Sequence, residues 1–228
     1  MNDVDLAAVG ALLGDPSRAA MLDALMAGRA LTAGELARVA SVSASTASEH
    51  LARLSGGGLV ESVKQGRHRY FRLAGPQVGA ALEALSHIAP AKPVTGMRQS
   101  GHAKALGFAR TCYDHLAGTC GVAVHDVSFA NGWLDATPAG YALTAAGERE
   151  FARLGVDLAR VRSARRAVAR PCLDWTERKP HLAGSLAADL TTRLIDLGWL
   201  VRRSRESRSL RLTETGRAGL EDLGCVLP

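Results

Sequence analysis

The sequence contains no long hydrophobic run. No stretch of its 228 residues approaches the roughly 18 consecutive apolar residues that a membrane-spanning helix requires. The first six residues, MNDVDL, are acidic and lack the positively charged start of a secretory signal peptide. We therefore expect a cytoplasmic protein with no membrane partner.

Cysteine is scarce as well. The chain has four cysteines, widely spaced, and its first 111 residues contain none. In a reducing cytoplasm, cysteines in such an arrangement are more often thiols than a disulfide framework. The sequence therefore predicts four thiols, at Cys112, Cys120, Cys172 and Cys225.

The motifs of common enzyme classes are also absent. There is no G-x-S-x-G nucleophile motif, no H-E-x-x-H zinc motif, no phosphate-binding loop and no dinucleotide-binding fingerprint. Cys172 and His181 could form a nucleophile pair, but their separation of nine residues does not indicate one. We therefore expect no enzyme and no catalytic residues, and the sequence identifies no cofactor.

The composition favours a folded protein with a polyanionic partner. The chain is 47% hydrophobic, which is enough for a substantial core and two domains, and its net charge is +6. This charge suits nucleic acid. The first 75 residues hold eight Lys and Arg against seven Asp and Glu, so their basic character depends on where the charges lie.

Residues 32–58 have the pattern of two helices joined by a tight turn. Thr32 and Glu35 form a capping-box signature at the start of the first helix. Residues 41–43 supply the turn, and three glycines at 56–58 end the second helix. The outer face of the second helix carries small hydroxyl side chains, which would let it lie close to the floor of a groove.

A basic β-hairpin is expected next. Residues 59–63 and 70–73 have the composition of short strands, and the segment between them, 64–69, is rich in Lys, Arg and His. Such a tip suits DNA phosphates or a minor groove. Together, these elements predict a helix-turn-helix followed by a wing.

These residues resemble the ArsR/SmtB family of winged-helix transcriptional regulators. The resemblance begins at L-G-D-P-S-R, residues 13–18, and extends over about residues 5–75. It includes E-L-A in the first helix, V-S-A-S-T-A-S-E-H-L in the second, and G-L-V and Y-F-R-L in the hairpin. The resemblance implies a homodimer that binds an imperfect palindrome in double-stranded operator DNA. It also implies repression that an inducer relieves.

Nine residues are predicted to contact DNA, and no cofactor should be required for that contact. The second helix is expected to place four side chains near base edges and Arg53 near a phosphate, and the wing is expected to contribute four more. The base-edge set is Ser45, Thr46, Ser48 and His50; the wing set is Lys64, Arg67, His68 and Arg69. Glu49 departs from this chemistry, because its negative carboxylate would lie near the DNA phosphates. We expect it either to accept from a cytosine amino group or to face an arginine of the protein.

One more amphipathic helix is expected over residues 79–89, with Val78, Leu82, Leu85 and Ile88 along one side. In the resembled family this helix pairs with the first helix of the chain in the dimer. The common metal sites of that family are absent, because there is no Cys-x-Cys before the recognition helix and His87 stands alone after the wing. We assign residues 1–90 to DNA binding and dimerisation, and 91–106 to a linker.

The remaining residues, 107–228, contain an internal duplication. H-L-A-G at residues 115–118 recurs at 181–184, and G-W-L at 132–134 recurs at 198–200 with the same spacing. R-T-C-Y-D and R-P-C-L-D precede them. Two copies of one unit follow, at about residues 110–155 and 170–224. The predicted fold class is mainly α with small β-hairpins (α+β): an N-terminal winged helix-turn-helix and two winged-helix-like repeats.

The duplicated domain is predicted to sense an effector. Its two R-x-C-x-D motifs are expected at helix starts, where Arg110 and Asp114 would pair four residues apart. Eight residues are candidates for the effector site: Arg110, Cys112, Tyr113, His115, Arg170, Cys172, Trp175 and His181.

Several interpretations of this domain remain open at the level of sequence. A small organic effector could lie between the repeats, or a soft metal or metalloid could bind Cys112, Cys120 and Cys172 with histidine assistance. The thiols could instead be redox sensors or buried structural groups. The winged helix itself could be a vestigial module used for protein contacts.

Overall fold

The computed structural model describes residues 4–90 and 96–228, which form two compact units. The N-terminal unit extends to Leu85 and includes Arg205–Arg208; the C-terminal unit consists of Ser86–Ser204 and Ser209–Pro228. Within the described ranges, no helix is long and apolar enough to cross a membrane.

The predicted linker needs a correction. Its residues 91–95 lie outside the described residues, but Met97–Phe108 forms helix α6. Most of the segment predicted as linker is therefore helical.

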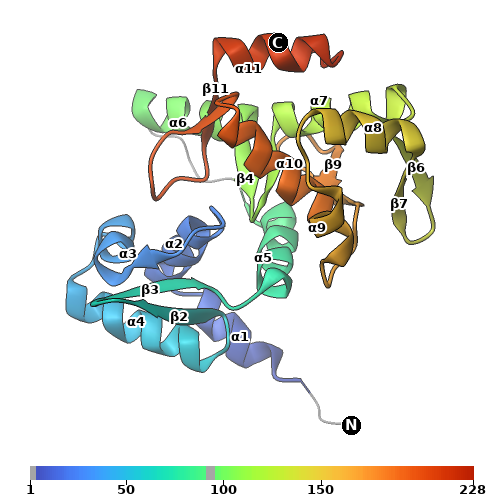
Figure 1. Cartoon of the computed structure of the whole chain (residues 1–228). Helices are drawn as coiled ribbons and strands as arrows, with labels where there is room; N and C mark the ends of the chain where they lie inside the picture. The colour runs from blue at the N-terminus through green and yellow to red at the C-terminus, as the bar shows by residue number, and fades with distance from the viewer. Residues whose placement is uncertain (1–3, 91–95) are drawn as a thin grey trace. The chain divides into compact units, whose positions relative to one another are not determined.

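The N-terminal unit is a winged helix-turn-helix (Figure 1). Its three strands form one antiparallel sheet in the order β1-β3-β2. Its elements are α1 (Leu6–Leu13), α2 (Pro16–Leu25), β1 (Leu31–Thr32), α3 (Ala33–Ala40), α4 (Ala44–Gly56), β2 (Val60–Gln65), β3 (His68–Leu73) and α5 (Pro76–Ile88).

Local capping explains where α3 and α4 begin. The Thr32 hydroxyl accepts from the Glu35 backbone N–H at 3.3 Å, and the Glu35 carboxylate accepts from the Thr32 backbone N–H at 2.7 Å. This is the predicted capping box, now confirmed. Ser41 ends α3 in the left-handed conformation, with φ of 54°, and Ser43 caps α4 by accepting from the Thr46 backbone N–H. The turn between the helices is therefore made by the residues that the sequence indicated.

The C-terminal unit repeats one order of elements. After α6, each repeat consists of a β-hairpin, a helix, a second hairpin and a further helix. The first repeat contains β4 (Arg110–Cys112), β5 (His115–Ala117), α7 (Thr119–Ala130), β6 (Leu134–Thr137), β7 (Gly140–Leu143), α8 (Ala145–Arg153) and then α9 (Leu158–Ser163). The second contains β8 (Arg170–Leu173), β9 (Pro180–Ala183), α10 (Ser185–Asp196), β10 (Leu200–Arg202), β11 (Leu210–Leu212) and α11 (Glu214–Asp222).

The two R-x-C-x-D motifs lie on strands β4 and β8, so their expected placement on helices is wrong. In β4, every residue is buried and pairs across the hairpin with β5. Pro171 has no N–H to donate, and β8 accommodates it as an edge of a two-stranded ladder. Cross-strand pairing and burial decide the conformation of segments this short.

The two repeats exchange their packing partners. Helix α7 of the first repeat packs on β9 of the second, and α10 of the second packs on β5 of the first. The contact is specific, because the Thr191 hydroxyl on α10 accepts from the Leu116 backbone N–H on β5 at 2.8 Å. This exchange builds one hydrophobic core from both repeats and brings hairpins β4–β5 and β8–β9 together.

Candidate functional site

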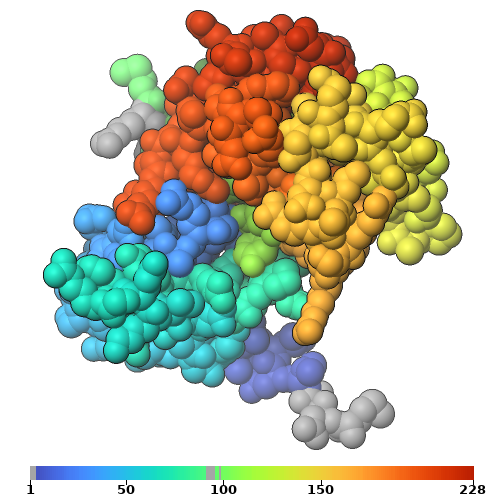
Figure 2. All heavy atoms as spheres, viewed as in Figure 1, coloured from blue at the N-terminus to red at the C-terminus, as the bar shows by residue number. Residues whose placement is uncertain are grey.

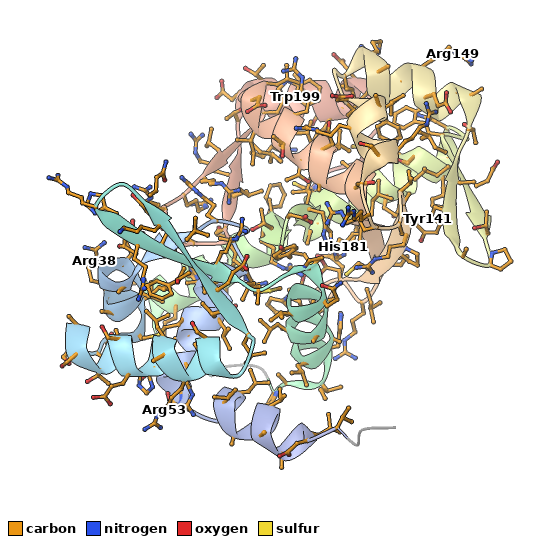
Figure 3. The ribbon with its side chains drawn as sticks, turned by 60° about the horizontal axis from the view of Figure 1, so that its bottom comes forward. Arg38, Arg53, Tyr141, Arg149, His181 and Trp199 are labelled. Atoms are coloured by element: carbon orange, nitrogen blue, oxygen red, sulfur yellow. The ribbon has the colours of Figure 1, made fainter. Side chains whose placement is uncertain are left out.

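Helix α4 presents a small-residue surface. Ser45 and Ser48 are exposed and Thr46 is half-buried. The Ser43 hydroxyl lies 2.8 Å from that of Ser45 and 2.9 Å from that of Thr46. Arg53 projects from the helix away from the ribbon (Figure 3). This surface has the small hydroxyls and the single cation that a groove-reading helix needs.

His50 does not belong to that surface. Its side chain is only 14% exposed and lies against α2, with Nδ1 3.4 Å from Arg18 and Nε2 3.9 Å from Asp15. Its position on the inner side of α4 corrects its assignment as a base-reading residue.

The wing is a regular antiparallel hairpin. Its register runs from Val60 opposite Leu73 to Gln65 opposite His68. All four predicted wing residues, Lys64, Arg67, His68 and Arg69, are exposed. The wing follows α4 in the chain and lies on the surface of the N-terminal unit (Figure 2). Three guanidinium and ammonium groups are therefore available at its tip.

A second site lies in the C-terminal unit, where two cysteines and two histidines converge. Cys112 pairs with His115 across hairpin β4–β5, and Cys172 pairs with His181 across β8–β9. The two sulfur atoms are 3.9 Å apart, and the two imidazole rings stack with their centroids 5.1 Å apart. One ligand atom from each of the four residues lies within 4.8 Å of every other. We call these four residues the Cys–His cluster.

The Cys–His cluster is shielded from solvent. His181 is fully buried inside the C-terminal unit (Figure 3), and Cys112 and His115 are 1% and 5% exposed. Cys172 is the partly exposed member. Burying several polar groups together is costly unless they find partners or bind an ion.

The electrostatics of the cluster favour a thiolate beside an imidazolium. The hydrogen bond with Cys112 lowers the pKa of the Cys172 thiol. Burial acts in the opposite direction, and the adjacent imidazoles of His115 and His181 lower the pKa further. Burial lowers the pKa of His115, but Asp114 and Cys172 outweigh burial, and the net pKa is raised. Cys172 therefore has the character of a metal-ligating or reactive thiolate.

Each histidine of the cluster has a carboxylate on its Nδ1 side. Asp114 Oδ1 lies 3.4 Å from His115 Nδ1, and Asp174 Oδ2 lies 3.5 Å from His181 Nδ1. The Nε2 atoms of both rings are buried and make no hydrogen bond. His181 Nδ1 also makes no hydrogen bond, so Nε2 is the nitrogen that both rings leave open for a ligand.

Asp174 holds the hairpins in place through a buried ion pair. Its carboxylate accepts from Arg110 at 2.9 Å and from the Gly118 backbone N–H at 2.7 Å, and it also bonds to Thr176. Burial would raise the pKa of Asp174, but Arg110 and these hydrogen bonds hold it well below its usual range. Arg110 thus pairs across the repeats, which corrects the expected pairing with Asp114.

The other predicted effector residues have different surroundings. Trp175 stacks on Arg110, whose guanidinium carbon is 4.5 Å from the ring centroid. Tyr113 is in the β4–β5 turn with φ of 59°. Arg170 donates to the backbone carbonyl of Pro171. Cys120 lies in the hydrophobic core, where burial, reinforced by Cys225, raises its pKa to about 12, so it is not a ligand of the Cys–His cluster.

The junction of the repeats is closely packed. A cavity lined by Leu116, Val124 and Leu190 measures about 10 Å³, which is the space of one water molecule.

Sequence reasoning places all four members of the cluster in one candidate site but does not separate them from its other members, and it assigns no site role to Asp114 or Asp174. The available signal is the repeated motif itself, because both copies end in Asp. A strand assignment would have paired each cysteine with the histidine across the turn.

Comparisons with known proteins agree with the N-terminal geometry. A family model described as a helix-turn-helix domain matches residues 13–63. The chain is 42% identical over 217 residues to the uncharacterized HTH-type transcriptional regulator YdfF of Bacillus subtilis (strain 168), covering 95% of this chain and 96% of that protein.

Solved structures match 36% to 41% of this chain. The homodimeric winged helix-turn-helix domain (fragment 1–100) of Mb0332 from Mycobacterium bovis, a possible ArsR-family regulator, is 31% identical, with a TM-score of 0.34, and 36% of this chain and 76% of that one are covered. The cadmium metal-sensor CMTR from Mycobacterium tuberculosis is 32% identical, with a TM-score of 0.33. The match covers 41% of this chain and 100% of that one.

The relationship to the Bacillus regulator extends over nearly the full length of both chains. The family model and the capped helices α3 and α4 with their wing agree with it. This protein therefore belongs to the HTH-type transcriptional regulators, and its N-terminal unit is their winged helix-turn-helix domain.

Proposed function

We propose that this regulator is a homodimeric repressor that binds operator DNA through α4 and the wing, and that an effector sensed in its C-terminal unit releases it. The observation that carries the DNA part is the joint exposure of the α4 hydroxyls and the basic wing tip in one unit. The helix would read base edges in a major groove while the wing contacts backbone or minor groove.

The proposal of a homodimer rests on α1 and α5. Helix α1 has the sequence LAAVGALL, yet none of its residues is buried. Leu6 is 76% exposed, Val9 38% and, on α5, Leu85 42%. An apolar surface of this kind marks an interaction site, and a second copy of the same unit would cover it with matching chemistry.

The proposal of effector sensing rests on the Cys–His cluster, whose buried Nε2 atoms make no hydrogen bond. A ligand that satisfies them stabilises one conformation of the C-terminal unit. If that conformation changes the distance between the recognition helices of the dimer, half-sites one helical turn apart lose register. Effector and operator are then linked by a coupling free energy.

Fluorescence anisotropy with DNA from upstream of the protein's own gene tests the DNA part. Replacing Arg67 and Arg69 with Glu should weaken binding and reduce the dependence of log K on log salt by about two units, because each arginine neutralises one phosphate. The matched control replaces Arg149 and Arg211, two exposed arginines of the C-terminal unit, with Glu. It changes the total charge equally and should leave most of the affinity.

Equal losses in the two double variants would show that only net charge attracts DNA, and the proposed interface would be wrong. If wild type fails to bind DNA while retaining a protein partner that the wing variant also binds, the winged helix is an interaction module.

A further inference from the structure

We infer that Cys112, His115, Cys172 and His181 bind one divalent transition-metal ion of the zinc class, and that this ion is the effector of the C-terminal unit. The inference deepens the proposed function and rests on it for the regulatory role. The ion would be held jointly by the two repeats, with one cysteine and one histidine from each.

The donor set is the first argument. Two thiolates and two imidazoles are a common set for tetrahedral zinc, whereas hard ions such as magnesium and calcium prefer oxygen ligands. The four residues offer their donor atoms within 4.8 Å of one another, although Cys112 and Cys172 are 60 positions apart in the chain. Their convergence is therefore a product of the fold and not of local sequence.

The spacing of the sulfur atoms is the second argument. A zinc–sulfur bond of about 2.3 Å in tetrahedral geometry places two thiolates about 3.8 Å apart. The observed separation of Cys112 Sγ and Cys172 Sγ is 3.9 Å. A disulfide needs a separation of about 2.05 Å, so the thiols lie at the distance of a shared ion.

The arrangement around the histidines is the third argument. Metal-ligating histidines usually direct their second nitrogen toward a carboxylate, which orients the ring and raises its basicity. Asp114 occupies that place at His115 Nδ1, within hydrogen-bond distance, and Asp174 lies 3.5 Å from His181 Nδ1 without making a hydrogen bond to it. The two Nε2 atoms are buried without a hydrogen bond, which is the condition that a metal ion would relieve.

The geometry of the Cys–His cluster gives the ion a route of entry and a way to act on the fold. Cys172 is partly exposed and gives the ion a route to the site. Once bound, the ion would link hairpin β4–β5 to hairpin β8–β9 and so tie the repeats to one another. Binding requires both cysteines as thiolates and both imidazoles neutral, so it releases the protons that these groups carry.

Cobalt(II) titration of the full-length, fully reduced protein tests the site without DNA. We expect one ion per chain, with the visible bands of tetrahedral cobalt and a thiolate-to-cobalt charge-transfer band, both displaced by zinc. Replacing Cys172 with Ala should abolish the charge-transfer band from that sulfur and weaken zinc binding by more than about 100-fold. Replacing Asp114 with Asn should weaken it by about 10- to 100-fold.

The matched control is Cys225→Ala, which removes a buried thiol of the same unit from outside the cluster. It should bind cobalt as wild type does. The wild-type spectrum tests the site even if a variant misfolds. Octahedral cobalt without a charge-transfer band in the wild-type protein would by itself overturn the proposed metal site. Formation of a Cys112–Cys172 disulfide by protein that takes up no metal when reduced would also overturn it, in favour of redox sensing.

Operator affinity measured with zinc and with excess chelator tests the role as effector. We expect zinc to weaken operator binding by about 5- to 150-fold in wild type and in Cys225→Ala, and to have no effect in Cys172→Ala. Metal binding without any change in operator affinity would overturn the effector role. If no variant binds DNA under any condition, the proposed function fails while the cobalt spectrum still decides the metal site.

Discussion

The buried pair Arg110–Asp174 gives a sharp test of how the C-terminal unit is held together. Both side chains are 0% exposed, and Arg110 donates to Asp174 at 2.9 Å. Arg110 also donates to the carbonyl of Leu106 and to the hydroxyl of Thr176. Replacing Arg110 with Met retains the apolar volume but leaves a buried carboxylate without its cation. Such a change costs about 3–5 kcal/mol of unfolding free energy.

Urea unfolding measures this cost. All three tryptophans of the chain lie in the C-terminal unit, so their fluorescence reports its unfolding. Far-UV circular dichroism must accompany it, because Trp175 stacks on Arg110 and its signal will change in the variant. A chelator keeps metal binding from contributing to the measured stability.

A control and a double-mutant cycle complete the test. Arg153→Met breaks an ion pair in the same unit whose arginine side chain is 64% exposed, and it should cost less than about 1 kcal/mol. Asp174→Asn combined with Arg110→Met should cost less than the sum of the two single changes, by about 0.5–3 kcal/mol. If Arg110→Met destabilises the unit no more than Arg153→Met, the reasoning from the buried pair is refuted.

Three further predictions concern a titrating cap, two glycines and the dimer surface. Burial raises the pKa of Glu35, but hydrogen bonds from Thr32 outweigh burial and the net pKa is lowered. Ionised Glu35 therefore stabilises the folded unit above the unfolded pKa of about 4.3, and this stabilisation is lost as pH falls through the folded pKa. Glu35→Ala should accordingly destabilise the N-terminal unit more at pH 7 than at pH 3 in thermal unfolding, and equal effects would contradict the capping role. Gly147→Ala would place a Cβ 2.1 Å from the Trp133 carbonyl oxygen, while Gly34→Ala meets nothing within 4 Å; denaturation should show a loss of about 1–3 kcal/mol for the first and no loss for the second. Replacing Leu6 and Leu85 with Glu should shift sedimentation toward a monomer, whereas Val226→Glu, at a position 88% exposed, should not.

The N-terminal unit can be predicted closely because its signals are local. Thr32 and Glu35 lie three residues apart and form their capping box within one helical turn. The hairpin from Val60 to Leu73 closes over a two-residue turn, so its register follows from short-range pattern. The sequence places His50 wrongly because helical spacing alone does not show that Asp15 and Arg18 approach that face.

The duplicated half shows where local reasoning ends. Leu-Thr followed by glycine three residues after the Thr occurs at 143–147 and again at 212–216. The structure supplies the reason for this glycine, because the backbone of Gly147 or Gly216 approaches a tryptophan carbonyl too closely for a side chain. The motifs with cysteine are wrongly predicted as helical because three or four residues carry no usable periodicity. Their burial and their strand partners decide otherwise.

By itself the sequence determined the winged helix-turn-helix and its basic tip, since both depend on neighbours within a few turns of chain. It also showed the two repeats, since the same motifs recur in the same order along the chain. Only the tertiary structure decided that Cys112 and Cys172 meet at 3.9 Å and that Arg110 pairs with Asp174 of the other repeat. These contacts join residues 60 or more positions apart. They form because α7 and α10 pack on each other's hairpins to bury one shared core, a long-range outcome that no local pattern encodes.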